Sequence, residues 1–251
     1  MRNYTSRTNY INKLLAYKDK DLIKVVSGLR RSGKSTLFEL YRNELILSGI
    51  DASQIVFLNF EDFELRKYLN DLDALYEFIT NQLDLSKPCY VFLDEIQNVK
   101  EFERIVDGLF VKPNIDVYIT GSNAFLLSSE LATLLSGRYI EISILPFSFK
   151  EYLSARKIDS SNKYLNFEAL FFDYVNETSL PKGVELREGG FEMIYEYLEA
   201  IYTTIVEKDI SQRHQINDKR AFGNITKFIS STLGSPISPT NISKSLIQDG
   251  K

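Results

Sequence analysis

The sequence predicts an α/β fold, in which a five-stranded parallel sheet is followed by a small helical region. Two observations carry this prediction. Up to Pro146, short apolar runs alternate with longer, polar-interrupted segments, which is the pattern of successive strand–helix units. After Pro146 the strand signals stop and the remaining periodicity is helical. The 251 residues, 44% hydrophobic and 25% charged, are enough for one large domain with appendages.

Five runs rich in β-branched or aromatic residues are the strand candidates, and most are apolar enough to be buried on both faces. They are Leu22–Ser27, Ile55–Asn59, Tyr90–Asp94, Val117–Thr120 and Tyr139–Leu145. Helix-length segments lie between them, at Lys34–Ser48, about Leu65–Leu83, Glu101–Phe110 and Ala124–Ser136. We therefore expect residues 21–146 to form one core domain, preceded by a helical lead-in over residues 1–20.

The part of the chain after Pro146 reads as helical. Helices are expected at Ser148–Ala155, Asn166–Val175 and Gly190–Val206, with loops at Asp159–Lys163 and Ser179–Gly189. These predict a helical subdomain over residues 147–206. The segment Ser235–Lys251 predicts one more helix, with Thr240 or Asn241 as its N-cap and Gly250 as its stop. The sequence ends soon after this helix signal, which is typical of a truncated chain or a fragment.

Charge and cysteine content limit the classes of protein to consider. The net charge of −4 is unevenly distributed, because residues 201–251 hold seven Lys and Arg against four Asp and Glu. A mildly basic tail of this kind is usually a solvated surface, and contact with nucleic acid is the other interpretation. The single cysteine, Cys89, excludes an internal disulfide framework and favours a reducing compartment, the cytoplasm. Neither a signal-peptide core nor a stretch of eighteen apolar residues is found, so we expect no membrane association.

The most specific motif is Gly28-Leu29-Arg30-Arg31-Ser32-Gly33-Lys34-Ser35, which fits the phosphate-loop pattern and lies between a predicted strand and a predicted helix. Glycines let the backbone curl so that its N–H groups and the helix N-terminus face phosphates. Lys34 is expected to reach the β- and γ-phosphates of ATP, and the Ser35 hydroxyl to ligate Mg²⁺. Arg30 and Arg31 are either solvated or ion-paired, or contact phosphate or a neighbouring subunit. The predicted nucleotide-binding residues are Gly28, Arg31, Ser32, Gly33, Lys34, Ser35 and Thr36.

The strand Tyr90–Asp94 ends in two adjacent carboxylates, Asp94 and Glu95. In phosphoryl-transfer sites, a strand-terminal aspartate helps to hold Mg²⁺ and a following glutamate can polarise the attacking water. Two carboxylates alone are a weak signal, but the phosphate loop upstream makes this interpretation specific. Asp94 is therefore the second predicted Mg²⁺ residue beside Ser35, and Glu95 and Lys34 are predicted catalytic residues.

Small polar residues follow two other strands at the edge where α/β sheets bind ligands. Ser122 and Asn123 could orient the catalytic water or sense the γ-phosphate, and capping of the next helix explains Ser122 equally well. Asn59 could hydrogen-bond Glu95 and hold it inactive, or it could form a turn. We include Asn123 among the predicted catalytic residues.

Arg138 follows the helix-ending Gly137 just before the fifth strand. A cation is favourable near the carboxyl end of a helix, which is the structural interpretation. The functional interpretation is an arginine finger that reaches the γ-phosphate in an adjacent subunit. The only histidine, His214, makes histidine-based metal clusters and Ser-His-Asp catalysis improbable, and Cys89 is expected in the core.

The motifs GLRRSGKS, VFLDEIQNV, ITGSNAFLL and LLSGRYIEISILPFSFKEYL closely resemble a prokaryotic family of AAA+-type ATPases, over nearly the whole chain. The resemblance implies a P-loop AAA+ core of strand order 5-1-4-3-2, a helical lid, a winged-helix-like region and a nuclease-like carboxy-terminal domain. It assigns Ser122 and Asn123 to the sensor position and Arg138 to the arginine-finger position. The start of the winged helix is implied at Ser238–Ile242, within residues 207–251. The family's Gly-Gly-Phe-Pro turn reads Gly-Gly-Phe-Glu here, ending at Glu192, and no second sensor arginine is placed.

Two functional hypotheses follow. The first is an ATP-hydrolysing AAA+ module that couples nucleotide state to a partner, with DNA and further copies of this chain as candidate partners. The second is a nucleotide-dependent switch or DNA-binding regulator with slow turnover. A small-molecule kinase is disfavoured, because Glu95 supplies a water-activating carboxylate and no acceptor pocket can be identified.

Overall fold

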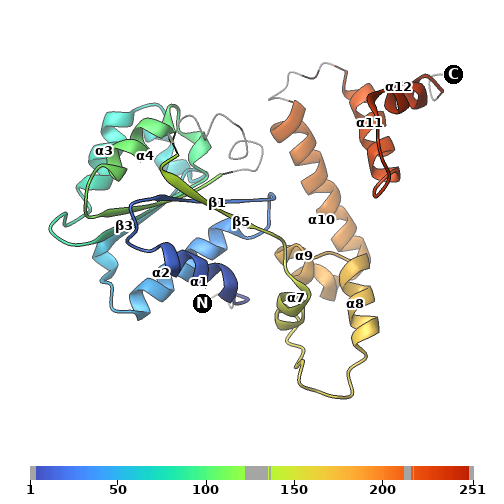
Figure 1. Ribbon diagram of the computed structural model, residues 1–251, viewed down its shortest axis with the longest axis horizontal. Helices are drawn as coiled ribbons and strands as arrows, with labels where there is room; N and C mark the ends of the chain where they lie inside the picture. Colours follow the sequence, from blue (N-terminus) through green and yellow to red (C-terminus); the bar gives the residue numbers. More distant parts are fainter. Residues whose placement is uncertain (1–3, 122–134, 136, 212–215, 217, 249–251) are drawn as a thin grey trace. The chain divides into compact units, whose positions relative to one another are not determined.

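The computed structural model describes residues 4–121, 135, 137–211, 216 and 218–248. Helix α1 (Thr8–Tyr17) leads into a βα core, and a series of helices follows it (Figure 1). The core strands are β1 (Ile23–Gly28), β2 (Ile55–Asn59), β3 (Cys89–Asp94), β4 (Ile115–Thr120) and β5 (Tyr139–Ile144). The core helices among the described residues are α2 (Lys34–Leu47), α3 (Leu72–Thr80) and α4 (Phe102–Phe110), with short 3₁₀ turns at Ala52–Gln54, Phe63–Tyr68 and Ile96–Asn98.

The five strands form one parallel sheet in the order β2-β3-β4-β1-β5. This confirms both the α/β prediction and the order 5-1-4-3-2. Strand β1 lies between β4 and β5, with Val26 opposite Thr120 on one side and Ile142 on the other. Strand β3 lies between β2 and β4, so that Asp94 is opposite Asn59. Because all strands run the same way, the residues that follow β1 and β3 lie at the same end of the sheet, where the strands have their carboxyl ends.

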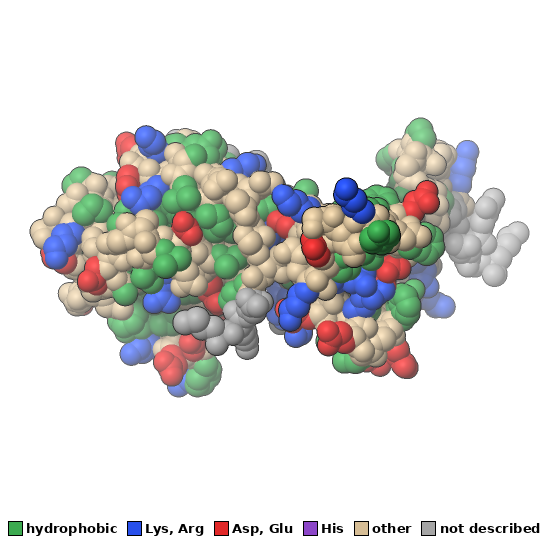
Figure 2. All heavy atoms as spheres, turned by 90° about the horizontal axis from the view of Figure 1, so that it is seen from below, with side chains coloured by type: hydrophobic (Ala, Val, Ile, Leu, Met, Phe, Trp, Pro, Cys, Tyr) green, Lys and Arg blue, Asp and Glu red, His purple; other side chains and the backbone are tan. Residues whose placement is uncertain are grey.

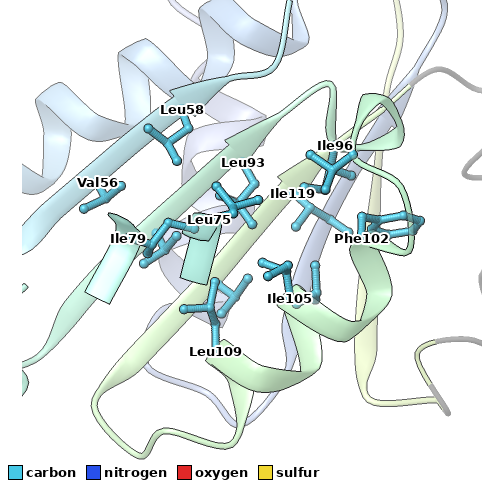
Figure 3. Close-up of a cluster of buried hydrophobic side chains, with 14 of the residues drawn as sticks. Val56, Leu58, Leu75, Ile79, Leu93, Ile96, Phe102, Ile105, Leu109 and Ile119 are labelled. Carbon is cyan, nitrogen blue, oxygen red and sulfur yellow. The ribbon is translucent and has the colours of Figure 1, made fainter. Parts of the chain in front are cut away.

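Side chains that alternate along the strands fill two separate hydrophobic layers. On one face, Val91 and Leu93 of β3 pack with residues of β1, β2 and β4 beneath α3 and α4. Figure 3 draws members of this layer, and those that it labels come from β2, β3, β4, α3, α4 and the turn after β3. On the other face, Tyr90 and Phe92 pack against α1 and α2. The sheet is therefore covered on both sides, which explains why its strands read as nearly continuous apolar runs.

The helix expected over about Leu65–Leu83 is divided in the structure. A 3₁₀ turn covers Phe63–Tyr68, and α3 begins only at Leu72. Asp71 ends the break, because its carboxylate accepts a hydrogen bond from the Ala74 N–H at 3.0 Å and so caps α3. The other core helices begin and end within a residue or two of the predicted positions. The predicted helix Ala124–Ser136 lies mostly outside the described residues.

Among the described residues, the α-helices between the core and residue 204 are α7 (Phe149–Ala155), α8 (Phe167–Asn176), α9 (Pro181–Leu186) and α10 (Phe191–Thr204). The prediction of a loop over Ser179–Gly189 is wrong, because α9 and a 3₁₀ turn occupy most of it. Pro181 is the first residue of α9, where the fixed backbone angle of proline favours a helix start and its missing N–H costs nothing. Phe147, Tyr152, Leu153 and Val184 form a small core that joins α7 to α9.

The chain separates into two compact units, Met1–Ile201 and Tyr202–Lys251. The second unit contains α11 (Lys219–Ser231), which the sequence analysis did not predict, and α12 (Pro239–Gln248). Helix α12 begins earlier than expected, and the cap is Ser238, whose hydroxyl accepts a hydrogen bond from the Asn241 N–H at 3.2 Å. Thr240 and Asn241 therefore lie inside the helix rather than at its cap.

Candidate nucleotide site

The phosphate loop joins the end of β1 to the start of α2, where the sequence predicted it. Arg31 and Gly33 both have left-handed backbones, with φ of 67° and 98°. Gly28 is required for a different reason. A Cβ at this position would lie 2.6 Å from the Ile144 carbonyl oxygen and 2.9 Å from the Ser32 hydroxyl, closer than packed atoms approach. The tight curl of the loop therefore depends on glycine at its first position.

Two side chains of the loop are withdrawn from solvent. Ser32 is fully buried, and its hydroxyl has no hydrogen-bond partner among the described residues. Lys34 is 5% exposed, and its ammonium group donates to the Gly28 carbonyl oxygen at 3.2 Å. An unpartnered buried hydroxyl is costly, and a phosphate oxygen is an acceptor that would pair it. Ser35, Thr36 and Gly33 are partly exposed, and Arg31 is exposed.

Asp94 lies at the end of β3 and is completely buried. Its carboxylate accepts hydrogen bonds from the hydroxyls of Thr120 and Ser35 and, at 3.0 Å, from the side-chain amide of Asn59. Burial raises the pKa of the Asp94 carboxyl, and the hydrogen bonds from Thr120 and Ser35 act against this shift. The two predicted Mg²⁺ residues, Ser35 and Asp94, are thus in contact with each other.

Glu95 follows Asp94 but leaves the direction of the strand, because its backbone is left-handed with φ of 54° and ψ of 46°. Its N–H donates to the Thr120 hydroxyl at 3.0 Å. Its side chain is 16% exposed, and Oε1 lies 4.0 Å from the Lys34 ammonium nitrogen. The structure therefore brings together two of the predicted catalytic residues, Lys34 and Glu95, which are sixty-one positions apart in the sequence.

Asn59 contacts a different carboxylate from the one anticipated. Its amide donates to Asp94, and its side-chain oxygen accepts from the Glu61 N–H at 2.9 Å, which closes a turn. The suggested hydrogen bond to Glu95 is therefore wrong in this structure, whereas the alternative of a turn is confirmed. Because β2 and β3 pair with Asn59 opposite Asp94, the amide reaches its direct neighbour across the ladder.

Thr120 is a site residue that the sequence analysis did not single out. It is fully buried at the end of β4, donates to Asp94 and accepts from the N–H of Glu95. One hydroxyl therefore holds the carboxylate of Asp94 and the backbone of Glu95. A hydroxyl-bearing residue at the end of a strand beside the carboxylate strand is the sequence signal that could have identified it.

Arg7 is a second residue that was missed, and it ties the phosphate loop to its surroundings. Its guanidinium donates to the carbonyl oxygens of Ser32 at 3.3 Å and Leu145 at 2.6 Å, and its Nε lies 2.9 Å from a carboxylate oxygen of Glu151 in α7. The guanidinium also lies 5.3 Å from the centre of the Phe147 ring. Only 4% of Arg7 is exposed, so these contacts hold a buried charge between the loop, the end of β5 and α7.

Helices α9 and α10 also approach the phosphate loop. A Cβ built on Gly33 would lie 3.7 Å from the Pro181 ring at the start of α9. On α10, the Tyr197 hydroxyl is buried and has no hydrogen-bond partner among the described residues. Burial raises the pKa of Tyr197, and the nearby positive charge of Arg31 opposes this. Pro181 of α9 and Tyr197 of α10 thus lie near the phosphate loop.

Arg138 lies at the end of the sheet where the strands begin, and the phosphate loop lies at the end where they finish. Arg138 precedes β5, and its carbonyl oxygen accepts a hydrogen bond from the N–H of Ile23, the first residue of β1. The phosphate loop follows the other end of β1, so the length of that strand, about 16 Å, separates the Arg138 backbone from the loop. Its guanidinium pairs with Asp107 at 2.9 Å and lies over the Phe110 ring, and its side chain is 40% exposed. Ser122 and Asn123, the other predicted catalytic position, lie outside the described residues.

The donor set at this edge fits a magnesium ion bound together with phosphates. Ser35 and Asp94 offer a hydroxyl and a carboxylate oxygen, the hard ligands that Mg²⁺ prefers, and Mg²⁺ takes its remaining ligands from water and phosphate. Among the described residues, no group of three His, Cys, Asp or Glu side chains forms a metal site independent of phosphate. Over the same residues, no helix has the length and apolar character needed to span a membrane.

Comparisons with known proteins agree with this architecture. Among curated proteins, the chain is 40% identical over 245 residues to an uncharacterised protein of Haemophilus influenzae, a match that covers 97% of this chain and 60% of that protein. It is 31% identical over 211 residues to an uncharacterised protein of Methanocaldococcus jannaschii, covering 78% of this chain and 43% of that one. The chain thus spans about half the length of these relatives.

Among solved structures, a Walker-type ATPase of Pyrococcus abyssi has the same fold, with a TM-score of 0.54 and 15% identity over 98% of this chain and 89% of that one. A family model for the AAA domain matches residues 20–153, which contain the whole sheet, the phosphate loop and both carboxylates. Since this match extends over more than half of the sequence, the chain belongs to the AAA domain family of P-loop ATPases.

Proposed function

We propose that this chain binds ATP together with Mg²⁺, hydrolyses the ATP, and uses the change of nucleotide to act on a partner. The observation that carries the proposal is the approach of the Glu95 carboxylate to within 4.0 Å of the Lys34 ammonium group. This pair sits where the loop that would hold the phosphates meets the end of β3. A carboxylate beside the phosphate-binding lysine favours water as the attacking group.

The phosphate loop supplies the binding energy for the triphosphate. The N-terminus of the fourteen-residue helix α2 and the backbone N–H groups of the curled loop face the same space and favour an anion. Lys34 would exchange its bond to the Gly28 carbonyl for the β- and γ-phosphates, and the buried Ser32 hydroxyl would gain an acceptor. Ser35 and Asp94 would hold Mg²⁺, which when bound neutralises charge on the phosphate oxygens.

Hydrolysis then needs one proton acceptor. The oxygen of a water molecule forms a bond to the γ-phosphorus, and the bond from that phosphorus to the β–γ bridging oxygen breaks, so that ADP leaves with the electron pair. The water gives a proton to Oε1 of Glu95. Lys34 stabilises the negative charge that accumulates on the phosphate oxygens. Asn123 is proposed to orient the same water.

The test is an ATPase assay with two variants that separate binding from chemistry. Lys34→Ala is expected to lose both ATP binding and turnover, because the phosphates lose their only proposed lysine contact. Glu95→Gln keeps the shape of the side chain but cannot accept a proton, so it is expected to bind ATP and to fall at least about 100-fold in kcat. Lys87→Ala, in an exposed ion pair, is the control. Wild-type turnover in both site variants would refute the proposal.

Arg138 is proposed to complete the site of a second copy of this chain. Its distance from its own phosphate loop excludes action within one subunit, and its half-exposed guanidinium is able to leave Asp107 for a phosphate. This role requires a homo-oligomer in the ATP-bound state.

The second candidate is a nucleotide-dependent switch or DNA-binding regulator with slow turnover. The basic excess after residue 200 and the compact helical unit Tyr202–Lys251, proposed as the start of a winged helix, favour it. On the face seen in Figure 2, Lys and Arg side chains are interspersed with Asp and Glu, so this face alone does not identify a DNA surface. Binding to duplex DNA that changes between ATP and ADP and weakens steeply with salt would support this candidate, and DNA binding unaffected by nucleotide would contradict it.

We also propose that residues 147–206 form a lid subdomain. The single cysteine, Cys89, favours a cytoplasmic location.

A further inference from the structure

The turn after β3 folds one side chain back onto the proposed catalytic carboxylate. Glu95 precedes the 3₁₀ turn Ile96–Asn98, and the Asn98 N–H donates to the Glu95 carbonyl oxygen at 3.2 Å. Within this turn, the side-chain amide of Gln97 donates to Oε2 of Glu95 at 2.6 Å. In an extended strand, positions 95 and 97 would lie on the same face about 7 Å apart, whereas the turn brings their side chains into contact.

This contact is the only hydrogen bond of the Gln97 side chain to the residues that the structure describes. The other end of the amide, Oε1, is buried and has no partner among those residues. The orientation of the amide is not arbitrary, because an ionised carboxylate only accepts hydrogen bonds and the amide nitrogen is the only donor that Gln97 has. The side chain is therefore directed at Glu95 and caps no helix and closes no other turn.

The two oxygens of Glu95 have different surroundings. Oε2 is occupied by Gln97, while Oε1 is the atom that lies 4.0 Å from the Lys34 ammonium nitrogen. The backbone at the same residue is held by the Thr120 hydroxyl. A glutamate has three rotatable side-chain bonds, so fixing its backbone alone leaves the direction of the carboxylate undetermined. Gln97 fixes the far end and leaves Oε1 available beside the proposed phosphate site.

We propose that Gln97 is a positioning residue for hydrolysis: its amide holds Oε2 of Glu95 so that Oε1 is presented to the attacking water. The inference rests on the proposed ATPase function and adds a residue to it. Asn59, which contacts Asp94 instead, has no part in this positioning.

The first measurement is steady-state ATP turnover of Gln97→Met, which keeps the length of the side chain and removes its hydrogen bonds. A catalytic group displaced by about 1 Å loses up to about 100-fold in rate, so we expect kcat to fall about 10- to 100-fold. ATP affinity, measured by direct titration, and the unfolding temperature are expected to stay at wild-type values. Gln82→Met is the matched control, because Gln82 is exposed and its amide reaches only the Phe78 carbonyl oxygen in the preceding helix, α3.

A second variant, Gln97→Glu, keeps a polar side chain of the same length but places an acceptor against Oε2 of Glu95. It is expected to lower kcat at least as much as Gln97→Met, again with unchanged ATP affinity. A loss of ATP affinity as large as the loss of kcat in both variants would overturn the proposal, because it would show a general disturbance of the site.

The decisive comparison is a double-variant cycle with Glu95→Gln. If Gln97 acts only through Glu95, adding Gln97→Met to Glu95→Gln causes no further loss of turnover. A full additional 10-fold loss in that background contradicts the inference, as does a wild-type kcat for Gln97→Met alone. These outcomes are distinguishable from failure of the ATPase proposal, in which Glu95→Gln itself retains wild-type turnover.

Discussion

Replacing Thr120 by valine removes one hydroxyl and leaves the shape of the side chain almost unchanged. In the wild-type protein this hydroxyl donates to the Asp94 carboxylate and accepts from the N–H of Glu95 at 3.0 Å. Asp94 keeps Asn59 and Ser35 as partners, but the partly buried N–H of Glu95 loses its side-chain acceptor. The variant therefore tests whether one hydroxyl holds both the carboxylate of Asp94 and the backbone of Glu95.

The size of the effect follows from these two bonds. A hydrogen bond to a charged group contributes about 1.5–3 kcal/mol, and a buried donor left without an acceptor costs about 1–3 kcal/mol. With partial relaxation, we expect the free energy of unfolding to fall by about 3 kcal/mol. For a protein of this size, that corresponds to a decrease of roughly 6–12 °C in unfolding temperature.

Thermal and urea unfolding measure the stability loss, and ATP titration and turnover measure the functional loss. The matched control is Thr80→Val, because the Thr80 hydroxyl bonds only to carbonyl oxygens of its own helix. The free energy of unfolding of this control is expected to lie within about 0.5 kcal/mol of the wild-type value. Thr120→Ser, which keeps the hydroxyl, is expected to lie between the two. If Thr120→Val were no less stable and no less active than Thr80→Val, the shared role of this hydroxyl would be refuted.

Three further predictions test the surroundings of the site. Gly28→Ala is expected to weaken ATP binding at least about 10-fold and to lower the free energy of unfolding by about 1–3 kcal/mol, because its Cβ would lie 2.6 Å from the Ile144 carbonyl oxygen. An ATP affinity equal to that of the wild-type protein would contradict this prediction. Arg7→Ala is expected to cost about 3 kcal/mol in urea unfolding, because it leaves the Glu151 carboxylate without its cation, whereas the exposed Arg104→Ala should be nearly neutral. Arg138→Ala and Lys34→Ala, each inactive alone, should recover part of the ATPase activity when mixed, and no recovery in a confirmed mixed oligomer would exclude a finger acting between subunits.

The sheet could be predicted from the sequence because its signals are local. Each strand is a short apolar run, and burial on both faces makes that run continuous. The phosphate loop is equally local, since all its residues lie between one strand and one helix. The meeting of Lys34 with Glu95 was predictable for a related reason: parallel strands bring their carboxyl ends to one edge.

The contacts that were missed are those that no local pattern encodes. Arg7 binds Ser32, Leu145 and Glu151, which lie far from it in the sequence, and nothing around Arg7 indicates a buried guanidinium. Helix α9 did carry a signal, Pro181 at its first position, but two glycines within the segment favoured a loop. The partner of Asn59 could not be assigned, because Asp94 and Glu95 are adjacent in the sequence. Their carboxylates point in different directions only because of the left-handed backbone at Glu95, which no sequence pattern predicts.

That turn decides the chemistry of the site. Asp94 belongs to the same face of β3 as Tyr90 and Phe92, the face covered by α2, and so meets Ser35. If the strand continued, Glu95 would alternate onto the face of Leu93, beneath α3 and α4 and away from Lys34.

The left-handed backbone at Glu95 reverses this and returns the carboxylate to the side of the phosphate loop. A non-glycine residue in that conformation costs about 1–3 kcal/mol, which the bonds of Thr120 and Asn98 to its backbone offset. The two adjacent carboxylates thus have different environments. Asp94 is completely buried beside the Thr120 and Ser35 hydroxyls, whereas Glu95 is partly exposed beside the Lys34 ammonium group. In the proposed mechanism, this conformation lets the adjacent residues Asp94 and Glu95 take the separate roles of metal binding and proton transfer.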